Sequence, residues 1–287
     1  MVYAVSSKDE LLGWPAGHPH RPEQVGSESL RAMLPSRALS LSVNGNRIFT
    51  GHIAEEGCVR VFDVSDPLGP RLDHTISADS GSVFDLRTSG DIIVAGLGDG
   101  LLKVWSSGRF GLITSLAAQE YFVLSVGVDP KYIYGGGTDN CTRAYARSDY
   151  SIVAVLEGHE ASVFCIESDD DFVYSGSGEL WWGGPGSPRP PQFESAVRIW
   201  SKDDWTCVAV LEGHQDNVNA VCVDRSAVYS VSDDCTLRVY SRNDWETASS
   251  VALGRVRPTS LCQDRELLYL GCSDGTVKRL VKKDLLA

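Results

Sequence analysis

The sequence repeats one pattern at intervals of about 40 residues, and this repeat limits the possible folds more than any other feature. In each copy an acidic residue precedes a bulky residue, which we call the anchor, by six positions. The pairs are Glu56–Phe62, Asp99–Trp105, Asp139–Tyr145, Glu194–Trp200, Asp234–Tyr240 and Asp274–Leu280. A second bulky residue follows the last five anchors by five positions, at Phe110, Tyr150, Trp205, Trp245 and Leu285. Such a shared register indicates duplication of one structural unit.

The unit from 218 to 251 shows the plan of a repeat most clearly. Val218, Ala220 and Cys222 alternate with other residues as in a strand, and residues 228–231 form a second run rich in β-branched residues. A turn at 233–235 leads to two further strand-like runs, 237–240 and 248–251. Four short strands per repeat at this period are typical of a propeller. The sequence therefore predicts an all-β propeller with six blades of four antiparallel strands.

Two elements resemble WD40 repeats. Leu-Glu-Gly-His ends at His159 and again at His214, and strand-like runs end at Trp105 and Trp200, as in the motif that gives the family its name. The resemblance covers about residues 38 to 287. It implies a WD40-type β-propeller in which a His, a Ser or Thr, an Asp and a Trp form a hydrogen-bonded tetrad.

Carried over to this chain, the tetrad falls on two successive blades. The matching residues are His159, Ser175, Glu194 and Trp200 in blade four, and His214, Ser230, Asp234 and Tyr240 in blade five. Blade one keeps Thr50 and Glu56 without a clear His, whereas blades two, three and six have Ala95, Gly135 and Leu270 at the Ser/Thr position. A His–Ser–acid trio could be mistaken for a nucleophilic triad. Because it recurs in consecutive blades, we interpret it as structural.

We expect residues 1–287 to form a single domain. Residues 1–37 would supply a closing strand and an irregular segment, and residues 38–287 the six repeats. Closure of the ring would remove exposed strand edges, so residues 2–6 are predicted to pair with Val277–Val281. The alternative is a seven-bladed ring that is incomplete or truncated.

Composition and charge exclude several classes of function. A formal net charge of −12 opposes binding to nucleic acid or an anionic membrane. The sequence contains neither a signal peptide nor an apolar run long enough to span a membrane. We therefore expect a cytoplasmic protein, with the nucleus as the alternative in a eukaryote.

The eight cysteines are interpreted as small apolar residues, because most recur at equivalent repeat positions. Free thiols fit a reducing compartment. No Cys-x-x-Cys pair is present, and His18-Pro19-His20 lacks neighbouring ligands, so no metal site and no cofactor are predicted.

Two segments interrupt the repeat and are where a binding site would be sought, namely an inserted loop at 178–193 and the irregular segment Leu12–Ser36. The Gly and Pro content of the loop cannot extend a hairpin. The loop carries residue types that supply most binding hot spots, namely Trp181, Trp182, Arg189 and Phe193. The alternative is that the two tryptophans fold back and cap a blade.

A further candidate is the pair Arg255 and Arg257, near the Gly-His position of blade six. These residues could bind an acidic or phosphorylated peptide. The acidic composition favours pairing with the chain's own carboxylates instead.

The expected function is a non-catalytic interaction scaffold, a monomer or part of a complex. It would bind a protein or peptide through one propeller face and the blade-four loop. The alternatives are a hydrolase-like propeller enzyme or a substrate-presenting subunit of a larger enzyme. Several His and carboxylate residues near the starts of the inner strands would support an enzyme, but Asp85 is the one carboxylate near that end.

Overall fold

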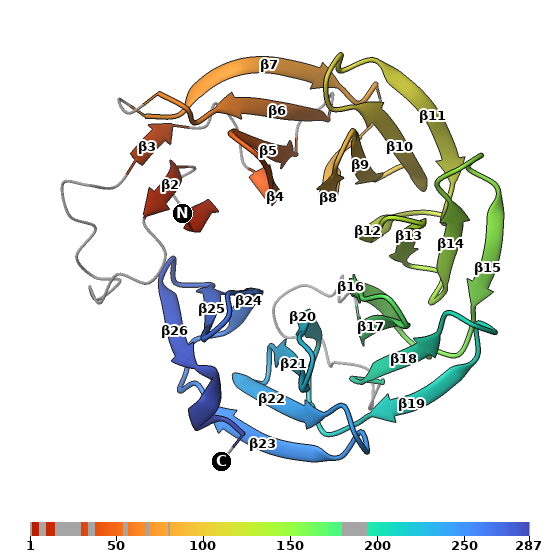
Figure 1. The fold of residues 1–287 in the computed structure, drawn as a ribbon, viewed down its shortest axis with the longest axis vertical. Helices are drawn as coiled ribbons and strands as arrows, with labels where there is room; N and C mark the ends of the chain where they lie inside the picture. Colours follow the sequence, from red (N-terminus) through yellow and green to blue (C-terminus); the bar gives the residue numbers. More distant parts are fainter. Residues whose placement is uncertain are drawn as a thin grey trace, which may run out of the picture.

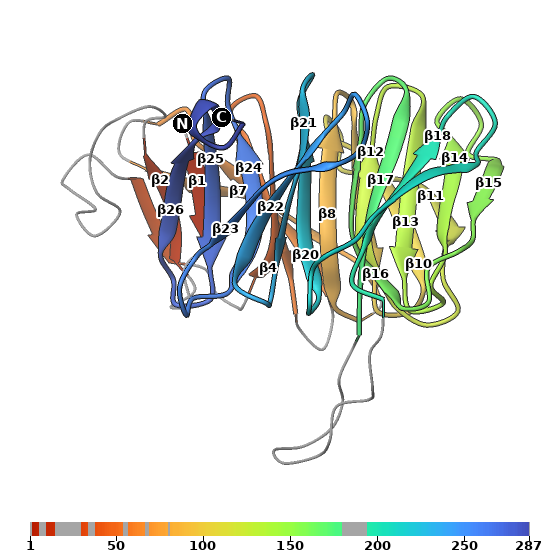
Figure 2. The ribbon, with the colours of Figure 1, turned by 90° about the horizontal axis from the view of Figure 1, so that it is seen from below.

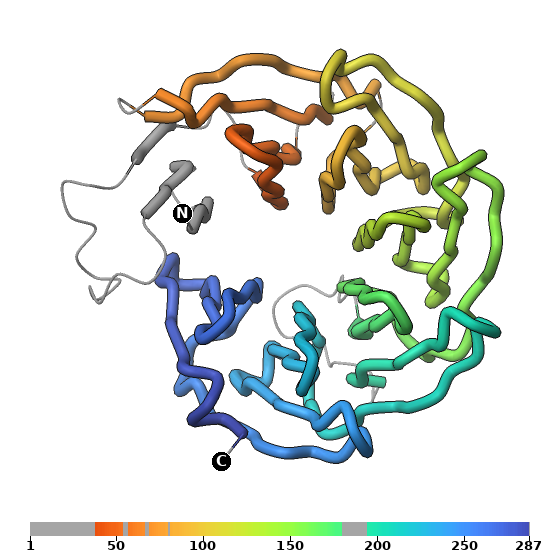
Figure 3. Tube along the Cα trace, in the orientation of Figure 1, coloured from red at the N-terminus to blue at the C-terminus, as the bar shows by residue number. Residues whose placement is uncertain are grey.

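The computed structural model describes residues 2–5, 10–14, 30–33, 38–53, 57–66, 69–79, 81–179 and 194–286. Residues 38–281 form six antiparallel sheets arranged as blades around a central axis (Figure 1). The blades follow one another around the ring in sequence order (Figure 3). The predicted six-bladed all-β propeller is therefore confirmed.

Blades one to three each contain four strands, which run in chain order from the innermost to the outermost. They are β4 (Ala38–Asn44), β5 (Arg47–His52), β6 (Cys58–Asp63) and β7 (Arg71–Ser77); β8 (Val83–Ser89), β9 (Ile92–Leu97), β10 (Leu101–Ser106) and β11 (Leu112–Ala117); and β12 (Val123–Val128), β13 (Tyr132–Gly137), β14 (Thr142–Ala146) and β15 (Ile152–Leu156).

Blades four and five also contain four strands, and blade six contains three. They are β16 (Ser162–Ser168), β17 (Phe172–Gly178), β18 (Val197–Ser201) and β19 (Cys207–Leu211); β20 (Val218–Val223), β21 (Ala227–Ser232), β22 (Thr236–Ser241) and β23 (Thr247–Ala252); and β24 (Pro258–Gln263), β25 (Leu267–Cys272) and β26 (Val277–Val281). A short 3-10 helix, Lys282–Asp284, follows β26.

The strands run between two faces of the ring, as the edge-on view shows (Figure 2). One face, which we call the Gly-His face, carries the connections between blades and the turns between second and third strands. Backbone bonds join these two sets of loops, as from Gly98 N to Ser82 O and from Asp233 N to Asn217 O. The opposite face carries the turns between first and second strands and between third and fourth strands.

The predicted closing pair is wrong. β1 (Val2–Val5) pairs with β2 (Glu10–Trp14), from Val2 opposite Trp14 to Val5 opposite Leu11, and β2 pairs in turn with β3 (Leu30–Met33). In the described part of the chain β26 pairs only with β25, so Val277–Val281 receives no strand from residues 2–6. Forming a hairpin across a short connection costs less chain entropy than joining segments from opposite ends of the sequence.

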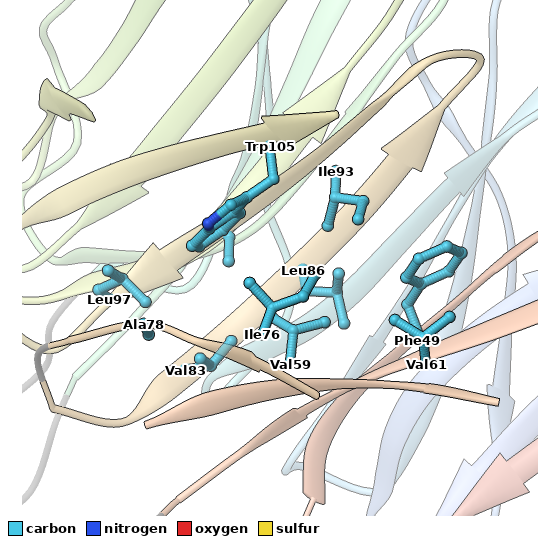
Figure 4. Packing of buried hydrophobic residues seen from close by; sticks show 11 residues of the cluster. Phe49, Val59, Val61, Ile76, Ala78, Val83, Leu86, Ile93, Leu97 and Trp105 are labelled. Atoms are coloured by element: carbon cyan, nitrogen blue, oxygen red, sulfur yellow. The ribbon is translucent and has the colours of Figure 1, made fainter. Parts of the chain in front are cut away.

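The core consists of apolar side chains packed between neighbouring blades. Figure 4 shows one such cluster, in which Phe49 and Val61 of blade one lie near Leu86 and Ile93 of blade two. The anchor Trp105 belongs to the same cluster and is 2% exposed. Anchors therefore join a blade to its neighbour, which explains why a large apolar residue recurs at that position.

The second bulky residue of each repeat joins adjacent blades at the opposite face. Phe110 stacks on His74 at 4.6 Å, Trp205 meets Tyr132 at 5.1 Å, and Trp245 meets Phe172 at 5.4 Å between ring centroids. In each pair the partner belongs to the preceding blade. These three residues and Tyr150 adopt positive φ angles of 56° to 64°, which are unfavourable for bulky side chains. The aromatic packing offsets that strain.

Candidate functional site

In blade four the four predicted tetrad residues lie within hydrogen-bonding distance of one another. Nδ1 of His159 is 2.7 Å from Oε2 of Glu194, and Nε2 is 2.7 Å from Oγ of Ser175. The indole Nε1 of Trp200 donates to the same Ser175 oxygen at 2.8 Å. Because Nδ1 donates to the carboxylate, Nε2 is the acceptor of the serine hydroxyl; this tautomer is assigned from the network. All four groups are thereby satisfied.

Glu194 also ties the incoming connection to the third strand. It accepts bonds from the backbone N of Glu160 at 2.9 Å and from Nε of Arg198 at 2.8 Å. Burial raises the pKa of the Glu194 carboxyl, but the bonds from His159, Glu160 and Arg198 outweigh burial and lower the pKa to about 2. The carboxylate is therefore a charged structural group over almost the whole pH range.

This shift predicts a loss of stability in acid. Since the folded pKa of Glu194 is about 2 and the ordinary value is 4.5, its contribution is present above about pH 4.5 and lost as pH falls toward 2. The contribution is on the order of 2–3 kcal/mol. Urea unfolding measured from pH 6 to pH 2 should show a smaller acid loss in Glu194→Gln than in the wild type. Equal losses in both proteins would contradict the assignment.

Blade five holds a related group with a different last member. Nδ1 of His214 is 2.9 Å from Oδ2 of Asp234, and Nε2 is 2.8 Å from Oγ of Ser230. Tyr240 donates its hydroxyl to the carbonyl of Glu212 at 3.3 Å. Burial raises the pKa of Asp234, but the bonds from His214 and its other donors outweigh burial and lower it. The tyrosine therefore links the third strand to the Gly-His connection.

Blades one and three use other residues, which sequence reasoning missed. In blade one Nε2 of His52 lies 2.7 Å from Oγ1 of Thr50, so the imidazole comes from the second strand itself. Glu56 lies outside the described residues. In blade three Gln119 occupies the His position and accepts from the backbone N of Asp139 at 3.1 Å. The signal was its spacing, because Gln119 precedes the buried inner-strand residue Val123 by four positions, as His159 precedes Val163 and His214 precedes Val218.

A second series of polar contacts lies on the opposite face and was also missed. In blades three to six an Asp accepts the hydroxyl of the Tyr five residues later; the pairs are Asp129–Tyr134, Asp169–Tyr174, Asp224–Tyr229 and Asp264–Tyr269. In blades three to five this Asp also binds a cation from the next blade, which lies two residues after that blade's anchor. The pairs are Lys202–Asp129, Arg242–Asp169 and Lys282–Asp224. Each of these cation–Asp pairs, which we call a latch, joins two neighbouring blades.

The candidate binding residues of the inserted loop, Trp181, Trp182, Arg189 and Phe193, lie outside the described residues. Both ends of the loop are held on the Gly-His face. Ser177 N donates to Ala196 O at 3.0 Å, and Glu179 N donates to Oδ1 of Asn217 at 2.8 Å. The loop thus departs and returns beside the Glu194 group.

Arg255 and Arg257 are both exposed in the connection that leads to β24. In the described part of the chain neither side chain forms an ion pair or a hydrogen bond. The expectation that they pair with the chain's own carboxylates is therefore not met there.

The described residues contain no group of three or more His, Cys, Asp or Glu side chains placed to hold a metal ion. Asp85, the inner-strand carboxylate near the Gly-His face, accepts bonds from the backbone N of Leu86 and Val126 at 2.8 and 2.9 Å. Burial raises its pKa. Among the described helices none has the length and apolarity needed to cross a membrane.

Comparison with known proteins agrees with the geometry. A family model described as WD domain, G-beta repeat matches residues 150–180 and 205–241. A crystal structure of the computationally designed Ika8 protein superposes with a TM-score of 0.69 at 22% identity, covering 87% of this chain and 72% of that chain. The chain is therefore a six-bladed β-propeller in which residues 150–180 and 205–241 match the WD40 repeat.

Its curated relatives are distant. Kinesin-like protein KIF21B is 19% identical over 210 residues in mouse and in human, which is 69% of this chain but 11% and 12% of those proteins. Cilia- and flagella-associated protein 52 of Chlamydomonas reinhardtii is 24% identical over 155 residues, or 52% of this chain and 23% of that protein. The chain thus spans a small part of the relatives it matches.

Proposed function

We propose that this propeller is a non-catalytic scaffold that binds a protein or peptide through its Gly-His face and the inserted loop of blade four. The observation that carries the proposal is the loop's setting. It interrupts an otherwise regular repeat, and its base is fixed by the bond from Ser177 to Ala196, which joins its two ends, and by the bond from Glu179 to Asn217. A loop with a rigid base can present the hot-spot residues Trp181 and Trp182 to a partner with little loss of entropy on binding.

The two His–Ser–acid groups support a structural role rather than catalysis. In blade four the serine hydroxyl donates to His159 while its oxygen accepts from Trp200, so a substrate would have to displace the indole. Ser175 is fully buried. A nucleophilic serine must instead reach its substrate.

We also propose a cytoplasmic location. All eight cysteines are free thiols, which fits a reducing compartment.

The test is affinity capture from the source cell with wild type and Trp181→Ala/Trp182→Ala. We expect one or more partners to be retained by the wild type and lost by the double variant, because the indoles supply the apolar contact. The matched control is Asp170→Ala/Asp203→Ala, which changes two exposed residues of the opposite face and should retain the same partners. Capture that is unchanged in the tryptophan variant would remove the loop from the proposal.

A further inference from the structure

A second candidate site lies on the opposite face, away from the proposed scaffold surface. The turns of blades five and six border a shallow, open pocket of about 380 Å³. Two arginines from equivalent positions, Arg225 and Arg265, line it together with Lys282. Three cations thus line one concavity of a chain whose net charge is −12.

The acidic residues of this pocket are already engaged. Asp224 binds Nζ of Lys282 at 3.0 Å, and Lys282 also donates to Oε1 of Gln263 at 2.6 Å. Asp264 accepts from the backbone N of Glu266 and Leu267, at 2.9 and 2.8 Å, and from the hydroxyl of Tyr269 at 2.9 Å. The two carboxylates are therefore occupied by other donors.

The two arginines, in contrast, have no such partners. Arg225 and Arg265 are exposed, and within the described part of the chain neither guanidinium forms an ion pair or a hydrogen bond. Each follows directly on its turn aspartate, Asp224 or Asp264. The guanidinium groups thus remain available to a ligand.

The propeller fold does not require arginine at this position. The residue after the equivalent turn aspartate is Pro130 in blade three and Asp170 in blade four. Adjacent blades five and six therefore differ from their neighbours in a way that the repeat itself does not explain.

We infer that this pocket binds an oxyanion, the phosphate or carboxylate group of a ligand, between the guanidinium groups of Arg225 and Arg265. Guanidinium presents a planar set of donors that matches both groups, and charge-assisted hydrogen bonds of this kind are the strong ones. Lys282 adds positive potential while staying bound to Asp224. This site is independent of the proposed scaffold surface because it lies on the opposite face.

The test is an NMR titration of the arginine Nε–Hε resonances with inorganic phosphate and, separately, with succinate, at constant ionic strength. We expect saturable shifts at Arg225 and Arg265. Arg225→Gln or Arg265→Gln should weaken the affinity by about tenfold, the effect of one charge-assisted bond. Tighter binding of phosphate or of succinate identifies which oxyanion the pocket prefers.

Arg109→Gln is the matched control, because Arg109 is an exposed arginine of the same face that does not line this pocket. This variant should bind as the wild type does. Shifts at Arg225 and Arg265 that rise linearly, or that equal those at Arg109, would show only general ion screening and would overturn the inference.

Discussion

Replacing Ser175 with alanine is expected to lower the free energy of unfolding by about 2–4 kcal/mol. The hydroxyl is fully buried and contacts both Nε2 of His159 and Nε1 of Trp200. Its removal leaves two buried polar atoms without partners, and each such atom costs about 1–3 kcal/mol. Urea denaturation followed by tryptophan fluorescence measures the change.

Ser230→Ala in blade five is the matched control. Ser230 contacts His214 and the hydroxyl of Tyr240, but it has no indole donor, and Tyr240 donates its own hydroxyl to Glu212. We therefore expect a smaller loss, about 1–2 kcal/mol. Equal effects of the two substitutions would show that the tryptophan bond adds nothing to the stability of blade four.

Asp129→Ala is expected to destabilise the protein by about 3–5 kcal/mol, the usual effect of removing one partner of a buried ion pair. Asp129 and Lys202 are each 9% exposed at the side chain. The aspartate also accepts from the hydroxyl of Tyr134 at 2.7 Å. The substitution would remove the counter-charge of the buried Lys202 ammonium and leave it with the Asp169 carbonyl as a neutral partner. Thermal and urea unfolding both report the loss.

Asp264→Ala tests whether the latch itself matters. Asp264 makes the equivalent contacts to its own blade, but no ion pair to it forms among the described residues. The expected loss is about 1–2 kcal/mol, from hydrogen bonds alone. If both aspartates gave the same loss, the bond between blades would contribute nothing to stability.

The sequence predicted those features that depend on residues within one repeat. Strand alternation and the fixed acid-to-anchor spacing indicated the six blades, and Gly-His with Ser and Trp indicated the residues that meet in blade four. The prediction succeeded because one turn and three adjacent strands bring these residues together whatever the rest of the chain does.

Contacts between repeats were harder to predict. The latch Lys202–Asp129 joins residues 73 positions apart, and its signals, an Asp five residues before a Tyr and a cation two residues after an anchor, are each too common to identify a contact. The prediction that residues 2–6 pair with Val277–Val281 was wrong for a related reason. A free strand edge accepts any suitable segment, so the outcome depends on competition between segments rather than on local pattern.

The two rims of the ring are stabilised by different kinds of contact. On one rim, latches and aromatic pairs such as Trp205–Tyr132 join neighbouring blades. On the other rim, groups such as His159–Glu194 in blade four and His214–Asp234 in blade five hold parts of one blade together. Loops of the Gly-His rim can therefore change in length or charge during evolution without breaking the latches and aromatic pairs that join the blades on the opposite rim. The extra residues between β17 and β18 lie on the Gly-His rim.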